Sequence, residues 1–203
     1  MSEVILTPEF FDRDPAETAR ALLGKALCRR TPEGLTSGRI VETEAYLAED
    51  DPACHANRGQ TPRNAMMFGP PGRAYVYSIH ARYCFNIVTE PTDRASAVLI
   101  RAIEPLEGLD LMHKRRQREK PVELTNGPAK LCEALAIDRE QNGLLLSEAE
   151  NLWIADDGPA VKTPTVMCSP RIGISAAQDL LLRFFWAENQ FVSGTKKNAR
   201  PVE

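Results

Sequence analysis

Strand-like segments outnumber helical ones in this chain, and they do not alternate with helices in the regular way that a parallel sheet requires. Residues 40–47 alternate in polarity, and residues 96–103 form a mostly apolar run. Residues 74–79 and 83–89 are expected to pair as a hairpin around residues 80–82. We therefore expect an α+β fold, in which a single domain spans residues 1–203 and helices flank a curved, mainly antiparallel β-sheet.

Helix signals occur in three other parts of the chain. Asp14 is placed to cap a helix whose first position is Pro15. We expect Pro105 to end the strand that precedes it, and a further helix to follow. The predicted helices are residues 14–29, 106–118 and 126–137, and short additional strands are predicted near residues 152–155 and 165–174.

Composition restricts the classes of protein that fit. The five cysteines are odd in number and scattered without a C-x-x-C pair, which argues against a disulfide framework and a structural zinc site, so we expect no metal. The chain starts without the features of a signal peptide, and no apolar stretch reaches the roughly 18 residues of a membrane span. We therefore expect an intracellular protein that does not contact membranes and that lies in the cytoplasm or nucleoid if its source is bacterial.

The charge distribution leaves the question of nucleic-acid binding open. The formal net charge is −3, whereas proteins that contact phosphates usually present a basic surface. Positive residues nevertheless cluster in HKRRQREK at 113–120 and KKNAR at 196–200. The first run is either part of a local basic surface or the solvated face of a helix.

The segment VETEAYL at residues 41–47 places two carboxylates on one side of a strand. Successive side chains point to opposite faces, so Glu42 and Glu44 share a face with Ile40 and Tyr46. One interpretation is a solvated face, which antiparallel sheets commonly have. The flanking Ile40 and Tyr46 fit the wall of a cleft instead, and both interpretations remain open at this stage.

Two polar side chains interrupt apolar strands and need partners. Arg101 lies within AVLIRAI, where a buried guanidinium requires a carboxylate, and Glu42 and Glu44 can supply one. The result is either an ion pair that only fixes strand register or a carboxylate held ionised as a general base. Asn86 in CFNIV either bonds a loop backbone or inspects a ligand. The aromatic rings around it form either a core or a pocket that stacks a flat ligand such as a base.

Several long motifs in order resemble one enzyme family. The motifs are GRIVETEAYL, QTPRN, G-x-AYVY, YCFN, LIRAIEPLEGL, GPAKLCEALAI and RIGI. They occur in family order, and the resemblance extends from about residue 5 to residue 195. On these motifs the chain resembles the alkyladenine (3-methyladenine) DNA glycosylases, which excise damaged purines in base-excision repair.

The resemblance implies roles for individual residues. Glu44 matches the general base that deprotonates the water attacking C1′ of the deoxyribose, and Arg101 matches the arginine that helps to hold this water. The backbone carbonyl of Ile174 matches the remaining ligand of the water. The residues that match those contacting the extruded base are Tyr46, His55 and Tyr77, which sandwich it and bond to it, and Asn86, which clashes with the amino group of normal guanine.

The resemblance also implies contacts with double-stranded DNA that carries a damaged purine. Family members usually place a tyrosine at the hairpin tip, where it wedges into the gap left by the flipped nucleotide. This chain is one residue shorter there, so Ile79 or His80 is expected to take that role, since apolar side chains can also intercalate. The other residues expected at the DNA are Arg63, Arg82 and Lys130.

The expected activity is that of a monofunctional glycosylase, a monomer without metal or organic cofactor, which leaves an abasic site. A mechanism using both carboxylates is an alternative, because residues two apart on a strand are separated by about 6.6 Å, near the lower limit for an inverting acid–base pair. Two other classes compete: a non-catalytic protein that binds damaged DNA, suggested by the short hairpin and the net charge, and a hydrolase of free nucleosides.

Overall fold

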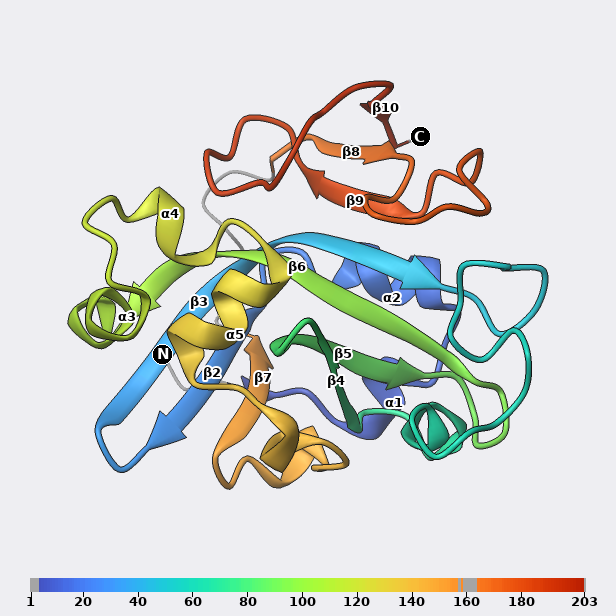
Figure 1. Ribbon diagram of the computed structural model, residues 1–203, viewed down its shortest axis with the longest axis horizontal. Coiled ribbons are helices and arrows are strands. Elements are labelled where there is room, and N and C mark those ends of the chain that lie inside the picture. Colours follow the sequence, from blue (N-terminus) through green and yellow to red (C-terminus); the bar gives the residue numbers. More distant parts are fainter. Residues whose placement is uncertain (1–3, 157, 159–163, 203) are drawn as a thin grey trace.

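A large antiparallel sheet organises the protein, in a computed structural model that describes residues 4–156, 158 and 164–202. Its main path runs β1-β7-β2-β3-β6-β5-β4, and every pairing between described strands is antiparallel (Figure 1). The expected α+β class is therefore confirmed. The strands are β1 Val4–Ile5, β2 Ala26–Thr31, β3 Gly34–Tyr46, β4 Ala74–Ile79, β5 Arg82–Thr89, β6 Ser96–Glu107, β7 Leu152–Asp156, β8 Val166–Ser169, β9 Arg183–Trp186 and β10 Arg200–Pro201.

The long strand β3 is the branch point of the sheet. Along one edge it pairs with β6, while its other edge pairs first with β2 and then, at residues 42–44, with β9. Strands β8, β9 and β10 form a branch of the same sheet, which joins β3 through β9 and lies beside the main path (Figure 1). Register shifts between β3 and β6 flank Glu42, which indicates a bulge at this position. The middle of β3 is consequently enclosed on both faces and along both edges.

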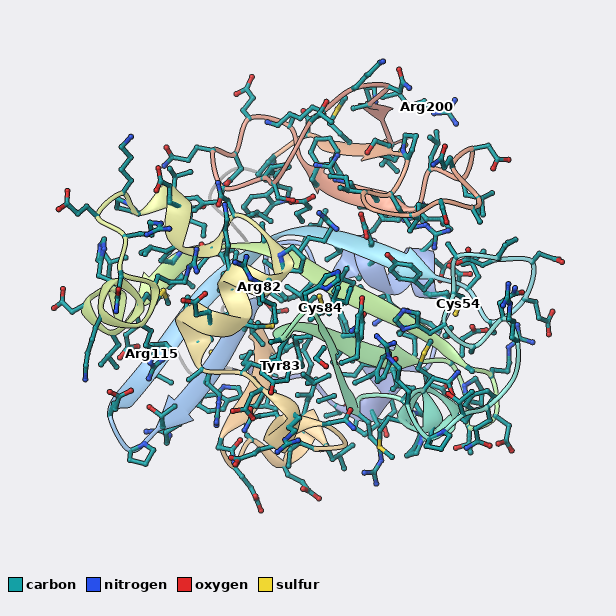
Figure 2. The ribbon with its side chains drawn as sticks, viewed as in Figure 1. Cys54, Arg82, Tyr83, Cys84, Arg115 and Arg200 are labelled. Carbon is teal, nitrogen blue, oxygen red and sulfur yellow. The ribbon has the colours of Figure 1, made fainter. Side chains whose placement is uncertain are left out.

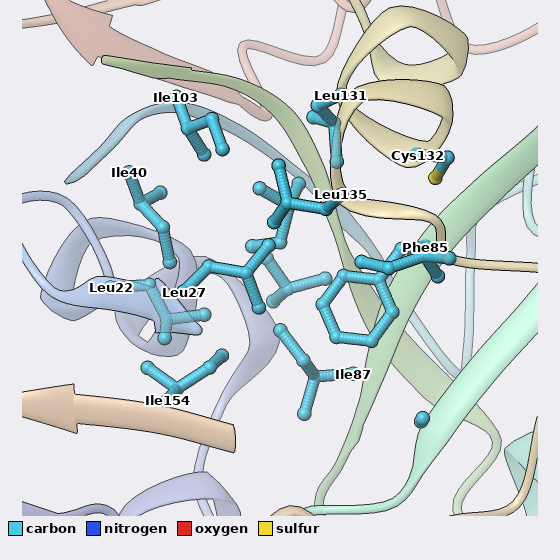
Figure 3. Close-up of a cluster of buried hydrophobic side chains, with 14 of the residues drawn as sticks. Leu22, Leu27, Ile40, Phe85, Ile87, Ile103, Leu131, Cys132, Leu135 and Ile154 are labelled. Atoms are coloured by element: carbon cyan, nitrogen blue, oxygen red, sulfur yellow. The ribbon is translucent and has the colours of Figure 1, made fainter. Parts of the chain in front are cut away.

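The helices are short and lie around the sheet. They are α1 Pro8–Phe11, α2 Pro15–Ala21, α3 Leu109–Arg116, α4 Val122–Thr125 and α5 Pro128–Leu135, with 3-10 turns at Ala65–Phe68, Arg139–Gln141 and Leu146–Glu148. Helix α5 packs on β5 and β6, and α2 packs on β3 and β6. Figure 3 shows Leu131 and Leu135 of α5 against Phe85 and Ile87 of β5 in the main apolar core. No helix of the described residues is long and apolar enough to cross a bilayer.

The predicted helix over residues 14–29 is correct only in its first half. Asp14 caps it as expected, because its carboxylate accepts bonds from the N–H groups of Ala16 and Glu17. The helix ends at Ala21, however, and Ala26–Thr31 forms β2. Gly24 has a φ of 90° in the connection, a conformation that glycine adopts readily. Pairing with β3 and β7 on both edges of β2 outweighs the helical tendency of its residues.

The prediction that Pro105 ends a strand is wrong. Strand β6 continues through Pro105 to Glu107, and Pro105 lies opposite Gly38 beside a register shift, where a missing N–H is tolerated. The strand ends at Gly108, whose φ is 75° and where a side chain would meet the backbone oxygen of Leu35. The following helix therefore starts at Leu109 rather than at residue 106.

The other predicted helices and strands are present, but most of their bounds differ from the predicted ones. Residues 74–79 form β4 and β5 begins at Arg82, so the predicted hairpin is confirmed, with His80 and Ala81 as a two-residue turn. The helix predicted over 126–137 spans Pro128–Leu135, and the strand predicted over 165–174 spans Val166–Ser169. Strand β9 was not predicted. All five cysteines are buried free thiols.

The position of Leu27 in the core leads to a stability prediction. Leu27 has no exposed surface, so Leu27→Ala should lower the free energy of unfolding by about 2–5 kcal/mol, the usual cost of such a cavity. The matched control is Leu106→Ala, at a residue that is 47% exposed, and it should cost less than about 1 kcal/mol. Chemical denaturation measures both values, and equal losses would contradict this placement of the core.

Candidate active site

One cavity of about 480 Å³ brings together most of the residues singled out from the sequence. Its walls come from the end of β3, the segment after it, the β4–β5 hairpin, β6 and residues 172–176. Cys84 of β5 lines this cavity, and Arg82 lies at the start of the same strand (Figure 2). The predicted site residues that line it are Tyr46, His55, Tyr77, Ile79, Asn86, Arg101 and Ile174.

Glu44 lies behind the cavity wall with no exposed surface. Its Oε1 accepts a bond of 2.7 Å from the Ile172 N–H and lies 3.2 Å from Arg101 Nη1. Its Oε2 accepts a 2.9 Å bond from the hydroxyl of Tyr46, a residue of the cavity wall. The interpretation of a solvated strand face is therefore wrong, because β9 and residues 171–173 cover this part of β3. Glu44 is instead a buried carboxylate held by three donors.

Glu42 is bound more completely than Glu44 and does not line the cavity. Its Oε1 accepts bonds from Arg101 Nε at 3.0 Å, Arg183 Nε at 2.7 Å and the Ser193 hydroxyl at 3.0 Å. Its Oε2 accepts a 2.6 Å bond from the Ser193 N–H. The expected ion pair of Arg101 is thus confirmed for both carboxylates. Since donors surround Glu42, its contacts favour a structural role.

Three rings, those of His55, Tyr75 and Tyr77, form an aromatic wall of the cavity. The His55 and Tyr77 rings meet edge to face with centroids 4.6 Å apart, and Tyr75 lies 5.5 Å from Tyr77. His55 Nδ1 shares a 2.9 Å hydrogen bond with the Tyr75 hydroxyl. Burial, with a smaller contribution from the positive charge of Arg63, lowers the pKa of His55, which favours the neutral imidazole. Burial raises the pKa of Tyr75 to about 12, so its hydroxyl remains protonated.

Tyr75 was not singled out as a site residue, although a signal for it was present. It lies two residues before Tyr77 on the same strand, and such residues point to the same face. The alternation alone could therefore have placed both rings in the wall.

Asn86 is buried and lines the cavity from the middle of β5. Its amide nitrogen donates to the backbone oxygens of Tyr75 at 3.0 Å and Cys84 at 3.4 Å. The partners are thus carbonyls of its own hairpin, rather than of a loop. Because these bonds fix the orientation of the amide, Asn86 presents a rigid polar group to any occupant.

The RIGI segment contacts Glu44 through Ile172 and lines the cavity with Ile172, Gly173 and Ile174. The Ile174 carbonyl accepts a 2.9 Å bond from Gln178. The backbone group bonded to Glu44 is the N–H of Ile172, which the sequence did not single out. The expected role of the Ile174 carbonyl stays a prediction.

The residues expected at DNA lie around the mouth of the cavity or on nearby α5. Ile79 is 46% exposed and lines the cavity, and it shares a shallow neighbouring hollow with His80 and Arg82. Arg63 is exposed, lies 5.7 Å over the ring of Tyr77 and donates to the Ser78 carbonyl. Lys130 donates to Asn126 on the approach to α5.

The basic run at 113–120 is largely occupied by ion pairs. Lys114 and Arg115 contact Glu33, and Arg116 contacts Glu133. Figure 2 shows Arg115 well away from Cys84, which lines the cavity, and Arg115 itself does not line it. The exposed positive charges nearest to the cavity are therefore Arg63 and Arg82 rather than those of residues 113–120.

Comparison with known proteins gives one consistent result. The family model described as methylpurine-DNA glycosylase matches residues 9–190. A protein of Rhodopirellula baltica is 46% identical over 96% of this chain and 85% of its own length. Relatives from Methanocella arvoryzae and Carboxydothermus hydrogenoformans are 48% and 46% identical, over 88% and 94% of this chain and 89% and 99% of their own lengths. All three are provisionally named 3-methyladenine DNA glycosylases.

The four bonds of Glu42 lead to a second stability prediction. Glu42→Gln keeps the shape but removes the charge that compensates Arg101 and Arg183, so it should cost about 3–5 kcal/mol of unfolding free energy. Glu133→Gln is the matched control, because its pair with Arg116 is half exposed on the glutamate side and should be worth less than about 1 kcal/mol. Similar losses in thermal or chemical denaturation would argue against a structural role for Glu42.

Proposed function

The chain belongs to the methylpurine-DNA glycosylase family, and from this premise we propose that it hydrolyses the N-glycosidic bond of alkylated or deaminated purines in duplex DNA. The substrate class comprises 3-methyladenine, 7-methylguanine, hypoxanthine and ethenoadenine. The products are the free base and an abasic site. The observation that supports this most is the contact of a fully buried carboxylate, Glu44, with both Arg101 and Tyr46 at an aromatic cavity.

A stacked base cannot present its glycosidic bond to a buried carboxylate, so the nucleotide must leave the duplex. The cavity volume of about 480 Å³ lies within the usual range for small-ligand sites. In this proposal Tyr46 stacks on the extruded purine from one side, and His55 and Tyr77 contact it from the other. Damaged or mispaired bases cost less to unstack, which contributes to selectivity.

Glu44 acts as the general base in the proposed reaction. Its carboxylate takes a proton from a water molecule, whose oxygen then attacks C1′ as the bond to the purine nitrogen breaks. The transition state resembles an oxocarbenium ion, which the negative charge of Glu44 also stabilises. The Ile172 N–H and Arg101 keep the carboxylate oriented. No lysine is found among the described residues that line the cavity, which favours water as the nucleophile and a monofunctional enzyme.

The lesions differ in how the base leaves. A methylated purine such as 7-methylguanine is cationic and leaves without much acid assistance, whereas a neutral base such as hypoxanthine needs protonation of its ring. In this proposal Asn86, which two carbonyl bonds hold in one orientation, rejects the exocyclic amino group of normal guanine. We propose that the enzyme acts as a monomer on double-stranded DNA.

Ile79 is the proposed wedge at the hairpin tip. It is the exposed apolar residue next to the turn, and it lies at the mouth of the cavity. His80 and Ala81 both have positive φ, so the turn is tight and projects Ile79 at the end of β4. An apolar side chain inserted between base steps stabilises the unstacked DNA.

Single-turnover release of ethenoadenine or hypoxanthine from duplex oligonucleotides tests the activity. Glu44→Gln should lower the rate by at least about 100-fold, the usual contribution of a general base, while duplex binding persists. The matched control is Glu49→Gln at an exposed position of the following loop, and it should release base at the wild-type rate. If the wild type binds lesion duplexes but releases neither these bases nor methylated purines, the non-catalytic alternative is correct.

The salt dependence of binding separates the remaining alternative. Duplex binding should weaken steeply with salt, because each phosphate contact releases counterions. A flat response would indicate a hydrolase of free nucleosides.

The wedge is tested in the same assay with Ile79→Ala. Loss of the side chain should lower base release by about 10-fold, since unstacking a step costs a few kcal/mol that the wedge helps to offset. Ile5→Ala, at another exposed isoleucine, serves as the control and should leave release unchanged. An unchanged rate of base release in Ile79→Ala would indicate that His80, rather than Ile79, is the wedge.

A further inference from the structure

A buried ion pair that the reaction above does not use lies behind Tyr46. Arg171 donates from Nη1 and Nη2 to the two carboxylate oxygens of Asp51, both at 2.6 Å, and neither side chain is exposed. Arg171 Nη1 also donates to the Ala45 carbonyl at 2.9 Å. Asp51 in turn accepts bonds from the N–H groups of Leu47 and Ala53. The pair therefore joins two chain segments that are 120 residues apart to the end of β3.

The guanidinium of Arg171 stacks on the ring of Tyr46. Its central carbon lies 4.6 Å from the ring centroid. Tyr46 lines the cavity whereas Arg171 and Asp51 do not, so the ring separates the ion pair from any occupant. Nε of Arg171 is buried without a partner among the described residues. An unsatisfied buried donor is unfavourable, so the arrangement keeps the guanidinium over the ring at the cost of one hydrogen bond.

The neighbours of both members form cavity walls. Pro52 and Ala53 directly follow Asp51, and Ile172 and Gly173 directly follow Arg171, and all four line the cavity. Ile172 is also the residue whose N–H bonds to Glu44. The ion pair thus positions Tyr46, the segment after β3 and the backbone donor of Glu44 at the same time.

The pairing also sets the charge behind the stacked ring. A purine stacked on Tyr46 at the usual ring separation would lie about 9 Å from the guanidinium, given the 4.6 Å between Arg171 and the ring. Two unit charges at this distance, with an effective dielectric constant of 20, change an equilibrium constant by roughly 20-fold. An uncompensated Arg171 would therefore weaken the binding of a cationic purine and leave the binding of a neutral purine unchanged. Asp51 cancels this charge. Although burial raises the pKa of Asp51, bonds from Arg171 and from backbone N–H groups lower it overall, so the carboxylate is ionised.

We propose that Asp51 and Arg171 form a charge-neutral positioning pair that holds Tyr46 against the extruded purine and lets the cavity accept cationic alkylpurines as well as neutral lesions. The inference rests on the proposed function, because it takes a purine as the occupant of the cavity. It assigns a role in substrate selection to two residues that touch neither the base nor the water.

The test compares two duplexes, one with 7-methylguanine and one with ethenoadenine, each carrying a 2′-fluoro sugar that prevents cleavage. The measured quantity is the ratio of their dissociation constants, which is independent of the fraction of active protein. Asp51→Asn should shift the ratio against the cationic lesion by roughly 20-fold, as the Coulomb interaction at about 9 Å indicates. Arg171→Met should shift it in the opposite direction, because it removes the positive charge behind the ring and leaves the Asp51 carboxylate with its two backbone donors.

The double variant Asp51→Asn/Arg171→Met removes both charges and should return the ratio to the wild-type value, even if both affinities fall. Asp50→Asn, at the exposed neighbouring aspartate, is the matched control and should leave the ratio unchanged. If one of the two single variants does not fold, the other still tests the inference, because a shift of its ratio in the predicted direction supports the inference and no shift contradicts it. A pair that only supports the fold would weaken both affinities equally in every variant, and this result would overturn the inference. If the wild type binds neither lesion duplex more tightly than undamaged duplex, the proposed function itself fails.

Discussion

The site depends on the charge compensation that Arg101 provides between two buried carboxylates. Glu42 and Glu44 have no exposed surface, and two such anions on one strand are tolerated only if cations and hydrogen-bond donors surround them. Arg101 contacts both, and Arg183 completes the compensation from β9. The two carboxylates and two guanidinium groups sum to zero charge. Strands β3, β6 and β9 must therefore meet in one register, because a shift by one residue would turn these groups to the other face.

Glu42 and Glu44 have the same side chain but different surroundings in this network. Glu42 is surrounded by Arg101, Arg183 and Ser193 and lies beside β9. Glu44 bonds to Tyr46 and to the Ile172 backbone, both of which line the cavity. The difference comes from the neighbours of each carboxylate rather than from the residue type. Two of the groups that hold Glu44 depend in turn on Arg171, which Asp51 binds: the Tyr46 ring stacks on its guanidinium, and Ile172 is the next residue in the chain.

Much of the candidate site could be predicted because its residues lie in long, ordered motifs with strand periodicity. Glu44, Tyr46, Tyr77 and Asn86 come from three strands, and the structure brings the cavity-lining residues among them to the wall beside Glu44. The two incorrect secondary-structure predictions have a common cause. Residues 26–31 have helical neighbours but pair with strands on both edges, and Pro105 lies at an irregular pairing that tolerates its missing N–H. Both outcomes depend on partners distant in sequence.

Alternation and motif order are local properties of the chain, so they were enough to predict the α+β class, the hairpin, the family and the residue types available for chemistry. The enclosure of the face of Glu42 and Glu44 depends instead on long-range packing, since β9 comes from about 140 residues further along the chain. The contact of the Ile172 N–H with Glu44 and the pairing of Asp51 with Arg171 behind Tyr46 likewise depend on long-range packing. These contacts are set by which distant segments pack together, and no local pattern encodes that choice.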